Sequence, residues 1–376
     1  MTLNEARELF PHIKSGKIYF NHAATGPFSK NVLSIVNEYL LQRSETNIDN
    51  FRELMEVAGE TRKYLCQILN CTADRIAFVD NTSNGLNILA QGIKWKKGDS
   101  IILNDIEFPA NVYPFLNLEK EGVEVEFVKS KNGIVSADDI ICSIKPSTRL
   151  ISISYVQFLT GYKVDLEKIG NVCREKGIIF SVDAIQGLGA FTLDVEKNKV
   201  DFISCGTAKW LLGMQGLAFI YISEKLQQQL EPKYVGWLSV ENAWNHLDYN
   251  LNLKKTADAL QGGTINALGV FGLLPSLKLF SEFGYKNVEE RIIENSTHFI
   301  KKLLEIGIHP ILKQCGKKNL SGIISFKHGK ANHILEELRK REIYCSVREG
   351  MVRLSPHFYN TLEEIDFVVD EIKNIL

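Results

Sequence analysis

The chain has 376 residues, more than one simple hydrophobic core usually holds, so we expect two domains. Hydrophobic residues make up 45% and charged residues 24%, as in ordinary globular proteins. The 44 basic and 45 acidic side chains leave a net charge of −1, which gives no electrostatic footprint for binding nucleic acid or an anionic membrane.

The N-terminal residues 1–17 are expected to form a short amphipathic helix and a turn, without the apolar stretch of a signal peptide. No segment approaches the ~18 consecutive apolar residues of a membrane span. The seven cysteines are scattered and none forms a CxxC pair. An odd number of cysteines without metal-ligand spacing indicates reduced thiols in a cytoplasmic protein, and no metal site is indicated.

Residues 75–225 alternate between short apolar runs and helical stretches. The expected strands are "RIAFVD", "SIILND", "VEVEFVK", "RLISISYV", "IIFSVDA", "DFISCGT" and "LAFIYIS". Strands that alternate with helices and are apolar almost throughout indicate a sheet covered on both faces. We therefore predict an α/β fold with a mostly parallel seven-stranded sheet.

The pattern changes after residue 265, where two long helical stretches, roughly 267–283 and 285–306, precede short strands and further helices. This part is expected to form a smaller α+β domain. We assign residues 16–264 to the large domain, and residues 1–15 and 265–376 to the small one.

Polar residues follow the ends of several predicted strands: Thr82 and Ser83, Gln157, Asp183, and Lys209. In open α/β sheets, ligands bind beyond the carboxyl ends of the strands. Each residue alone has an ordinary explanation, since an aspartate there often caps a helix and a lone lysine is usually solvated. Their placement on one rim of the sheet favours a shared ligand.

Pyridoxal 5′-phosphate (PLP) is a cofactor that needs these groups together. A lysine in an apolar setting is favoured as the neutral amine, which can bond to the cofactor's aldehyde. A buried carboxylate such as Asp183 keeps the pyridine nitrogen protonated, so that the ring can act as an electron sink. The phosphate needs N–H groups and hydroxyls at a helix N-terminus, which the Thr82–Ser83 segment supplies. PLP is therefore the expected cofactor.

The motifs also carry a family resemblance, from "YFNHAATGP" near the start to "VRLSPHFYNTLEEID" near the end. With D-x-x-Q followed by K-W-L, the chain resembles the class V aminotransferase family of fold-type I PLP enzymes. That family also includes cysteine desulfurases, selenocysteine lyases, kynureninases and isopenicillin N epimerase-like proteins. The resemblance spans nearly the whole chain.

The resemblance implies a role for each cofactor-binding position. Lys209 would anchor the cofactor and move the proton at the substrate's α-carbon, Asp183 would face the ring nitrogen, and Gln186 the phenolic oxygen. The other implied contacts are Thr82 and Ser83 with the phosphate, Phe108 stacked on the ring, and Gln157 beside the ring and the substrate carboxylate. Thr207 is a further possible phosphate ligand, or simply a residue that ends its strand.

The resemblance also implies substrate and subunit contacts. Arg353 would clamp the substrate α-carboxylate with its planar fork. His22 and Arg348 are further candidates for substrate contact, with packing and surface pairing as their alternatives. Thr264, in "LQGGTINALG", would reach the phosphate of a neighbouring subunit, which implies a homodimer.

Departures from the family pattern bear on the reaction. Many cysteine desulfurases carry His where this chain has Ala208 and in the segment of Phe108, and place a nucleophilic cysteine on a loop before the terminal arginine. Here "IYCSVREGMVRLS" is too short for that loop, and Cys345 lies in an apolar strand pattern. Persulfide transfer is therefore disfavoured.

We expect amino-group chemistry at the α-carbon of a small amino acid, as in a class V aminotransferase or an epimerase-like member. The alternative is a β-lyase or cysteine desulfurase-like activity. A non-catalytic PLP-binding sensor is less favoured, because regulators of that kind usually append a DNA-binding module. A nucleotide-binding protein is weaker still, because no glycine-rich phosphate motif follows any strand.

Overall fold

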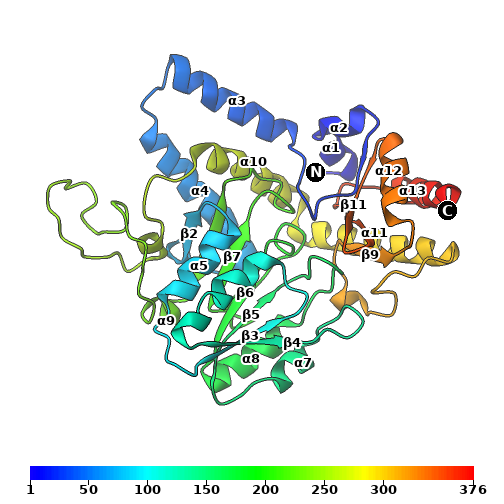
Figure 1. Ribbon diagram of the computed structural model, residues 1–376. Coiled ribbons are helices and arrows are strands. Elements are labelled where there is room, and N and C mark those ends of the chain that lie inside the picture. Colours follow the sequence, from blue (N-terminus) through cyan, green and yellow to red (C-terminus); the bar gives the residue numbers. More distant parts are fainter.

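The computed structural model describes residues 1–376 and is built around a seven-stranded sheet (Figure 1). Its strands are β2 (Ile76–Val79), β3 (Ser100–Asn104), β4 (Glu124–Val128), β5 (Thr148–Ser154), β6 (Ile179–Asp183), β7 (Phe202–Gly206) and β8 (Ala218–Ile222). They lie in the order β2-β8-β7-β6-β5-β3-β4. Only β8 is antiparallel to its neighbours, so the predicted, mostly parallel seven-stranded sheet is confirmed.

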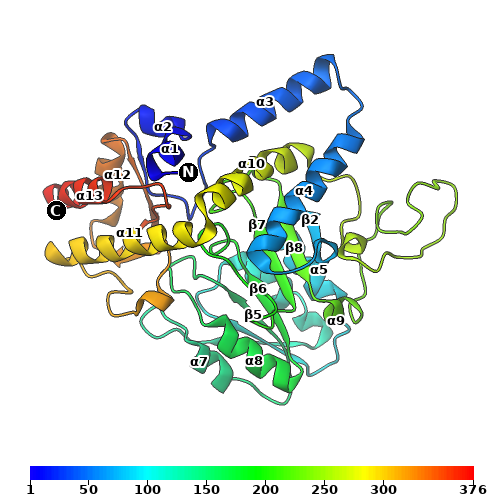
Figure 2. The same cartoon turned by 180° about the vertical axis from the view of Figure 1, so that it is seen from behind.

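Helices cover both faces of this sheet (Figures 1 and 2). One face packs against α4 (Phe51–Leu69), α8 (Leu166–Lys176) and α10 (Ala267–Phe283), and the other against α5 (Thr82–Gly92), α6 (Tyr113–Leu116) and α9 (Glu224–Gln227). Phe180 and Ile179, neighbours on β6, belong to the two different cores. This explains why the strands are apolar throughout rather than alternating.

The smaller unit contains a three-stranded antiparallel sheet of β9 (Ile324–Lys327), β12 (Met351–Leu354) and β11 (Ser346–Arg348). Its helices are α11 (Tyr285–Glu305), α12 (Ala331–Lys340) and α13 (Leu362–Ile375). The N-terminal helices α1 (Leu3–Glu8) and α2 (Pro11–Lys14) lie against this unit (Figure 1). The predicted α+β character of the C-terminal part agrees with this arrangement.

Two contacts bear on the expected domain borders, which stay a prediction. The short strand β1 (Ile18–Tyr19) pairs in parallel with β10 (Ile343–Tyr344), so residues 18–19 belong to the small unit. Helix α10 packs against α4 and α3 (Lys30–Glu45) of the large unit, and it meets α11 at an 84° bend. The packing of α10 thus favours a border nearer Gly284 than residue 265. A helical pattern shows that a helix has an apolar face, but not which core that face joins.

The remaining elements are short: α7 (Ala137–Cys142) and the 3₁₀ turns Ala73–Arg75, Pro109–Asn111, Glu119–Glu121, Ala257–Leu260 and Lys317–Asn319. No single helix is long and apolar enough to cross a membrane. Helices α10 and α11 together pass that test by length and composition, but they are bent against each other, and α10 is largely buried in the core.

Helix α3 and the loop 231–256 project from the body of the molecule (Figures 1 and 2). Most of the exposed large apolar side chains belong to these two regions or directly flank α3: Phe28, Leu33, Leu40, Leu41, Ile48, Tyr234, Val235, Trp237, Trp244, Leu247, Tyr249 and Leu251. We call this set the exposed apolar surface.

Candidate active site

The parallel strands β5, β6 and β7 are neighbours, so their carboxyl ends meet at one edge of the sheet. Gln157, Asp183 and Lys209 lie at or just beyond these three ends. Thr82 joins them because its hydroxyl accepts a hydrogen bond from the backbone N–H of Gly206 at 3.0 Å, and its carbonyl accepts one from Ser204 Oγ. The fold thus brings residues from four separate segments to one rim.

Asp183 is a buried carboxylate with one oxygen left over. It is 1% exposed, and its Oδ1 accepts from the backbone N–H of Ile185 at 3.0 Å, while Oδ2 has no partner. Burial raises the pKa of Asp183 to about 7; the Ile185 hydrogen bond opposes this rise, and the charge of Glu107 adds to it. A cationic N–H donor opposite Oδ2 would satisfy this oxygen and restore the carboxylate form.

Lys209 is held on a loop that the N-terminal segment clamps. The carbonyl of Ala208 accepts hydrogen bonds from the backbone N–H of Gly26 and the hydroxyl of Thr25. A Cβ atom at Gly26 would collide with the Lys209 carbonyl oxygen, so the "ATGP" segment needs glycine for this close approach. The lysine pairs with no carboxylate. Burial lowers its pKa to about 8, against the opposing charge of Asp183.

Gln186 is tied to neighbouring residues rather than free in the site. Its Nε2 donates to the Ala23 carbonyl at 3.0 Å, and its Oε1 accepts from the Trp210 indole at 2.8 Å. One N–H of Gln186 is left for a ligand oxygen. Trp210 is fully buried, which agrees with the expectation that it is a wall or core residue.

Phe108 borders the lysine. Its ring centroid lies 5.5 Å from Lys209 Nζ, and its ring meets Phe158 edge-to-face at 5.2 Å. Phe108 is 42% exposed, unusual for phenylalanine, and an exposed aromatic ring can stack on a flat ligand.

Arg353 is a buried guanidinium without a counter-charge. It is 2% exposed, and its only partners are the Phe158 carbonyl, 2.7 Å from Nη1, and Ser346 Oγ, 3.3 Å from Nε. Burial lowers its pKa to about 10, and the neighbouring Arg348 lowers it further. A buried, unpaired guanidinium is costly, and a bound carboxylate would offset that cost. Arg348 itself is exposed and donates only to the Val347 carbonyl.

The N-terminus of α5 supplies the remaining donors. Asn81 caps the helix by accepting from the N–H of Asn84. Thr82 keeps its own hydroxyl hydrogen for another acceptor, and Ser83 lies half-buried in the first turn. Thr207 does not share this role, because its single hydroxyl hydrogen is directed to the carbonyls of Met214 and Leu217.

His22 is enclosed by neighbouring residues, which gives no support to the expected contact with a substrate. It is fully buried, its Nδ1 contacts the Ser355 carbonyl at 2.8 Å, and its Nε2 contacts the Tyr359 hydroxyl at 2.6 Å. Burial, together with the neighbouring His357, holds the pKa of His22 well below its usual value. The packing alternative therefore describes His22.

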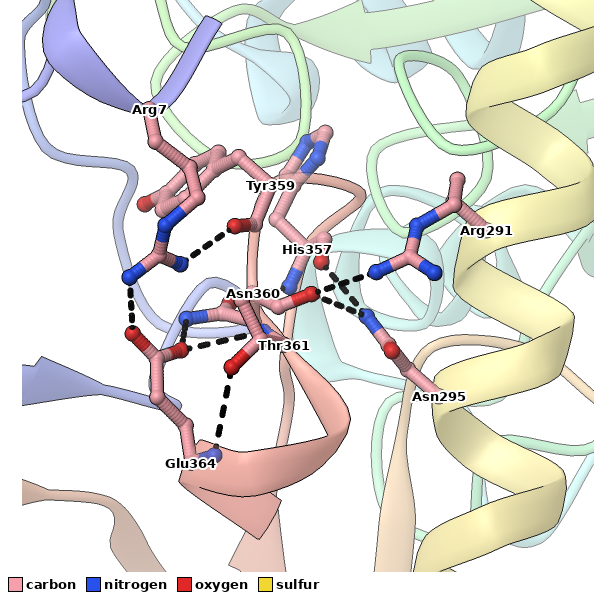
Figure 3. Close-up of polar contacts among 8 residues, drawn as sticks. All are labelled: Arg7, Arg291, Asn295, His357, Tyr359, Asn360, Thr361 and Glu364. Carbon is pink, nitrogen blue, oxygen red and sulfur yellow. Dashed lines mark hydrogen bonds and ion pairs between the residues drawn. The ribbon is translucent and has the colours of Figure 1, made fainter. Parts of the chain in front are cut away.

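The C-terminal "YNT-x-EEID" motif is structural as well (Figure 3). Glu364 accepts from Asn360, from the backbone N–H of Thr361 and from Arg7, while Asn295 donates to the carbonyls of His357 and Asn360. These contacts cap α13 and tie it to α1 and α11. We call this group the junction cluster, defined as Arg7, Arg291, Asn295, His357, Tyr359, Asn360, Thr361 and Glu364.

Thr264 lies apart from the lysine. It is exposed and lines two surface cavities, of about 870 and 970 Å³, neither of which is lined by Lys209 or Asp183. Within one subunit it therefore contributes nothing to the rim, and the contact with a neighbouring subunit stays a prediction.

Sequence reasoning missed Glu107, which is 7% exposed and accepts hydrogen bonds from Asn104, Ser154 and Gln157. Its place directly before Phe108 was the one available signal. Nothing in the spacing shows that this glutamate is buried.

The unsatisfied groups of the rim fit PLP. Asp183 Oδ2 offers an acceptor for the pyridine N–H, Lys209 an amine for the aldehyde, the α5 N-terminus donors for the phosphate, and Phe108 an exposed aromatic ring. Arg353 would remain free for the carboxylate of an amino acid.

Comparison with known proteins shows the family of the chain. The family model "Aminotransferase class-V" matches residues 18–368. An uncharacterized aminotransferase of Bacillus subtilis, YcbU, is 26% identical over 369 residues, which cover 97% of this chain and 96% of that protein. Other relatives of similar identity bear the name "Probable cysteine desulfurase".

Solved structures share the fold. A cysteine desulfurase from Thermococcus onnurineus superposes with a TM-score of 0.89 at 24% identity, covering 99% of this chain and 97% of that one. The cystine C–S lyase C-DES, solved with its product cysteine persulfide, gives a TM-score of 0.87 at 22% identity over 97% and 99% of the two chains. The chain belongs to the PLP-dependent class V aminotransferase family.

Proposed function

We propose that the protein is a PLP-dependent lyase that cleaves the carbon–sulfur bond of a cysteine-like amino acid and releases the sulfur to solution. This is the alternative that the sequence left open, and it replaces the expected transamination or epimerisation. The names of the relatives support the change, since cysteine desulfurases and a C–S lyase recur among them.

The observation that carries the proposal is the hairpin between β11 and β12. Its turn consists of Glu349 and Gly350, with φ of 47° and 72°, and it leaves no loop to carry a nucleophilic cysteine. Cys345, just before β11, is 8% exposed, and burial raises the pKa of its thiol to about 12. A thiol in that state is a poor sulfur acceptor. The rim therefore has the groups to start α-carbon chemistry, but none to hold the sulfur afterwards.

The residues of the rim would have separate roles in this reaction. Arg353 would bind the substrate carboxylate and so fix the α-carbon relative to Lys209. A lysine whose pKa is about 8 has a substantial neutral fraction near physiological pH, so Lys209 can take the α-hydrogen as a general base. PLP, when bound, supplies an electron sink for the pair left at the α-carbon. Loss of sulfur from the β-carbon then needs no further protein nucleophile.

Transamination is the second candidate, favoured by the description of the family and the name of YcbU. It needs the same base and the same carboxylate clamp. The two reactions differ in their products: β-elimination releases sulfide and ammonia together with a keto acid, whereas transamination releases a keto acid alone and keeps the amino group on the cofactor.

The deciding experiment incubates the PLP-loaded protein with cysteine, cystine and alanine and measures all products. C–S lysis of cysteine yields pyruvate, ammonia and sulfide in equal amounts, and a Lys209→Ala variant yields none. Alanine as the product would indicate desulfuration instead. A keto acid from alanine without ammonia, with conversion of the cofactor to its amine form, would establish the transaminase.

We also propose that the active unit is a homodimer, in which Thr264 reaches the neighbouring phosphate. The exposed apolar surface supports this, since a cluster of exposed aromatic side chains usually marks an interface. Sedimentation velocity measures the assembly state. In a dimer, substituting Thr264→Ala should weaken PLP binding without unfolding the chain, and a stable, active monomer would contradict the proposal.

A further inference from the structure

Two dipeptides lie side by side at the rim: Glu107–Phe108 and Gln157–Phe158. Gln157 Nε2 donates to Glu107 Oε1 at 3.0 Å, and the two phenyl rings meet edge-to-face at 5.2 Å. Phe108 borders Lys209, and the Phe158 carbonyl accepts from Arg353. The pair of dipeptides, which we call the double bracket, therefore connects the lysine to the arginine.

Glu107 anchors the double bracket through hydrogen bonds alone. Its carboxylate forms no salt bridge and accepts from Asn104 Nδ2 at 2.6 Å, from the Ser154 N–H at 2.8 Å, from the Ser154 hydroxyl, and from Gln157. Three of these four donors converge on Oε1. A buried carboxylate satisfied by so many fixed donors is held rigidly.

This contact decides the orientation of Gln157. Only the N–H side of an amide can face a carboxylate, so the side-chain oxygen must point away from Glu107. That oxygen is buried and has no hydrogen-bond partner, and Gln157 as a whole is only 3% exposed. A buried acceptor of this kind lacks a donor that a ligand or a neighbouring group would supply. It would repel a substrate carboxylate, which Arg353 is placed to bind.

We propose that Glu107 is a positioning residue that orients Gln157 so that its oxygen accepts a hydrogen bond from the amino nitrogen at the reacting position, carried by Lys209 or by the amino acid substrate. This differs from the contact with the substrate carboxylate that the family resemblance implies for Gln157. It rests on the proposed role of Lys209 as the amine of the site. Lys209 is the complementary group: a cation next to Phe108 that pairs with no carboxylate.

The lysine arm of the test uses the cofactor-free protein and does not depend on any reaction. The pKa of Lys209 is measured from the pH dependence of its labelling by an amine-specific reagent, read by peptide mass spectrometry. Gln157→Leu removes an acceptor that favours the ammonium form, so we expect the pKa to fall by about one unit. Glu107→Ala frees the Gln157 amide to turn and should move the pKa in the same direction.

Glu107→Gln is the matched control. It keeps one oxygen for the three convergent donors, and the Ser154 hydroxyl can turn to accept from the new amide. Gln157 should therefore keep its orientation, and the pKa of Lys209 should stay close to the wild-type value. A shift in Glu107→Gln as large as in Glu107→Ala would overturn the positioning role and leave only an effect of charge.

The substrate arm compares how the PLP-loaded protein binds an amino acid and the matching carboxylic acid without the amino group. Gln157→Leu should weaken the amino acid about tenfold and leave the carboxylic acid unchanged. A response in either arm supports the proposal and identifies the source of the N–H group, whereas no response in both overturns it. Failure of C–S cleavage would not alter the lysine arm, so the two proposals fail separately.

Discussion

The junction cluster and the active-site rim are two sets of polar side chains that differ in whether their charges and hydrogen-bonding atoms have partners. In the junction cluster the charged side chains have counter-charges: Arg7 pairs with Glu364 at 2.6 Å (Figure 3), and Arg291 pairs with Glu294, which lies outside the cluster. At the rim, Lys209 and Arg353 have none, and Asp183 Oδ2 and Gln157 Oε1 lack partners. The junction cluster leaves Arg291 Nε and Asn295 Oδ1 unpaired, but its charges are balanced.

This difference separates structural from functional polar residues. Folding selects against buried groups without partners, because each carries a desolvation cost. A region that keeps several of them, with cations and acceptors on opposite sides of one space, is organised for a ligand that supplies the missing contacts. The presence of a buried histidine does not mark a functional region, since the fully buried His22 and His357 both have hydrogen-bond partners within the protein.

Lys209→Ala is the most direct test of whether the unpaired groups of the rim serve a function. We expect turnover to fall by roughly 10⁴-fold or more, because both the base and the anchor of the cofactor are lost. The bound cofactor should lose its link to the protein, visible as a change in its absorption spectrum. Thermal unfolding of the cofactor-free variant should be unimpaired, since the lysine has no partner to lose. A variant that keeps its turnover would refute the functional reading of the rim.

Arg353→Lys tests the planar fork while keeping the charge. We expect KM for the amino acid to rise by about 10- to 100-fold with a smaller change in kcat, because an ammonium cannot bind a carboxylate with two parallel hydrogen bonds. Arg348→Lys is the matched control at an exposed position. If both substitutions raise KM equally, the carboxylate is held by the field of the two arginines rather than by Arg353.

Much of this arrangement could be predicted from the sequence, because it depends on local pattern. The strands, the sheet class and the polar residues at strand ends follow from apolar runs and from the rule that ligands bind at carboxyl ends. The sequence could not show that α10 joins the large core, or that Glu107 is buried while Arg348 is not. Those outcomes depend on tertiary packing, which sequence spacing does not encode.

Asp183→Asn measures how much the unpaired, buried Asp183 carboxylate lowers the free energy of unfolding of the cofactor-free protein. The folded pKa of about 7 lies above the reference value of 3.8, so between these pH values the folded state binds a proton that the unfolded state does not. Stability therefore falls as pH rises from 4 to 7, and the loss persists above pH 7. In Asn this loss is absent, so the variant should gain roughly 2 kcal/mol on the wild type between pH 5 and pH 8.

Urea unfolding of both cofactor-free proteins at the two pH values gives this difference directly. Titration of all other groups is common to the two proteins and cancels. The same variant should bind PLP poorly, because an amide does not hold the ring nitrogen protonated. Parallel pH curves for the two proteins would show that Asp183 has found a partner in solution, and would remove one of the unsatisfied groups on which the comparison rests.

Glu364→Gln should have the smallest effect, and it acts on the satisfied side of the comparison. The Glu364 carboxylate pairs with Arg7 and accepts hydrogen bonds from Asn360 and Thr361. The side chains of Arg7 and Glu364 are 19% and 14% exposed. We expect the free energy of unfolding to fall by about 1–2 kcal/mol, with kcat and KM unchanged. A double-mutant cycle with Arg7→Met should recover a coupling energy of about 1 kcal/mol. If Glu364→Gln instead lowers kcat at unchanged stability, the junction cluster transmits an effect to the rim, and satisfied hydrogen bonds would not suffice to mark a residue as structural.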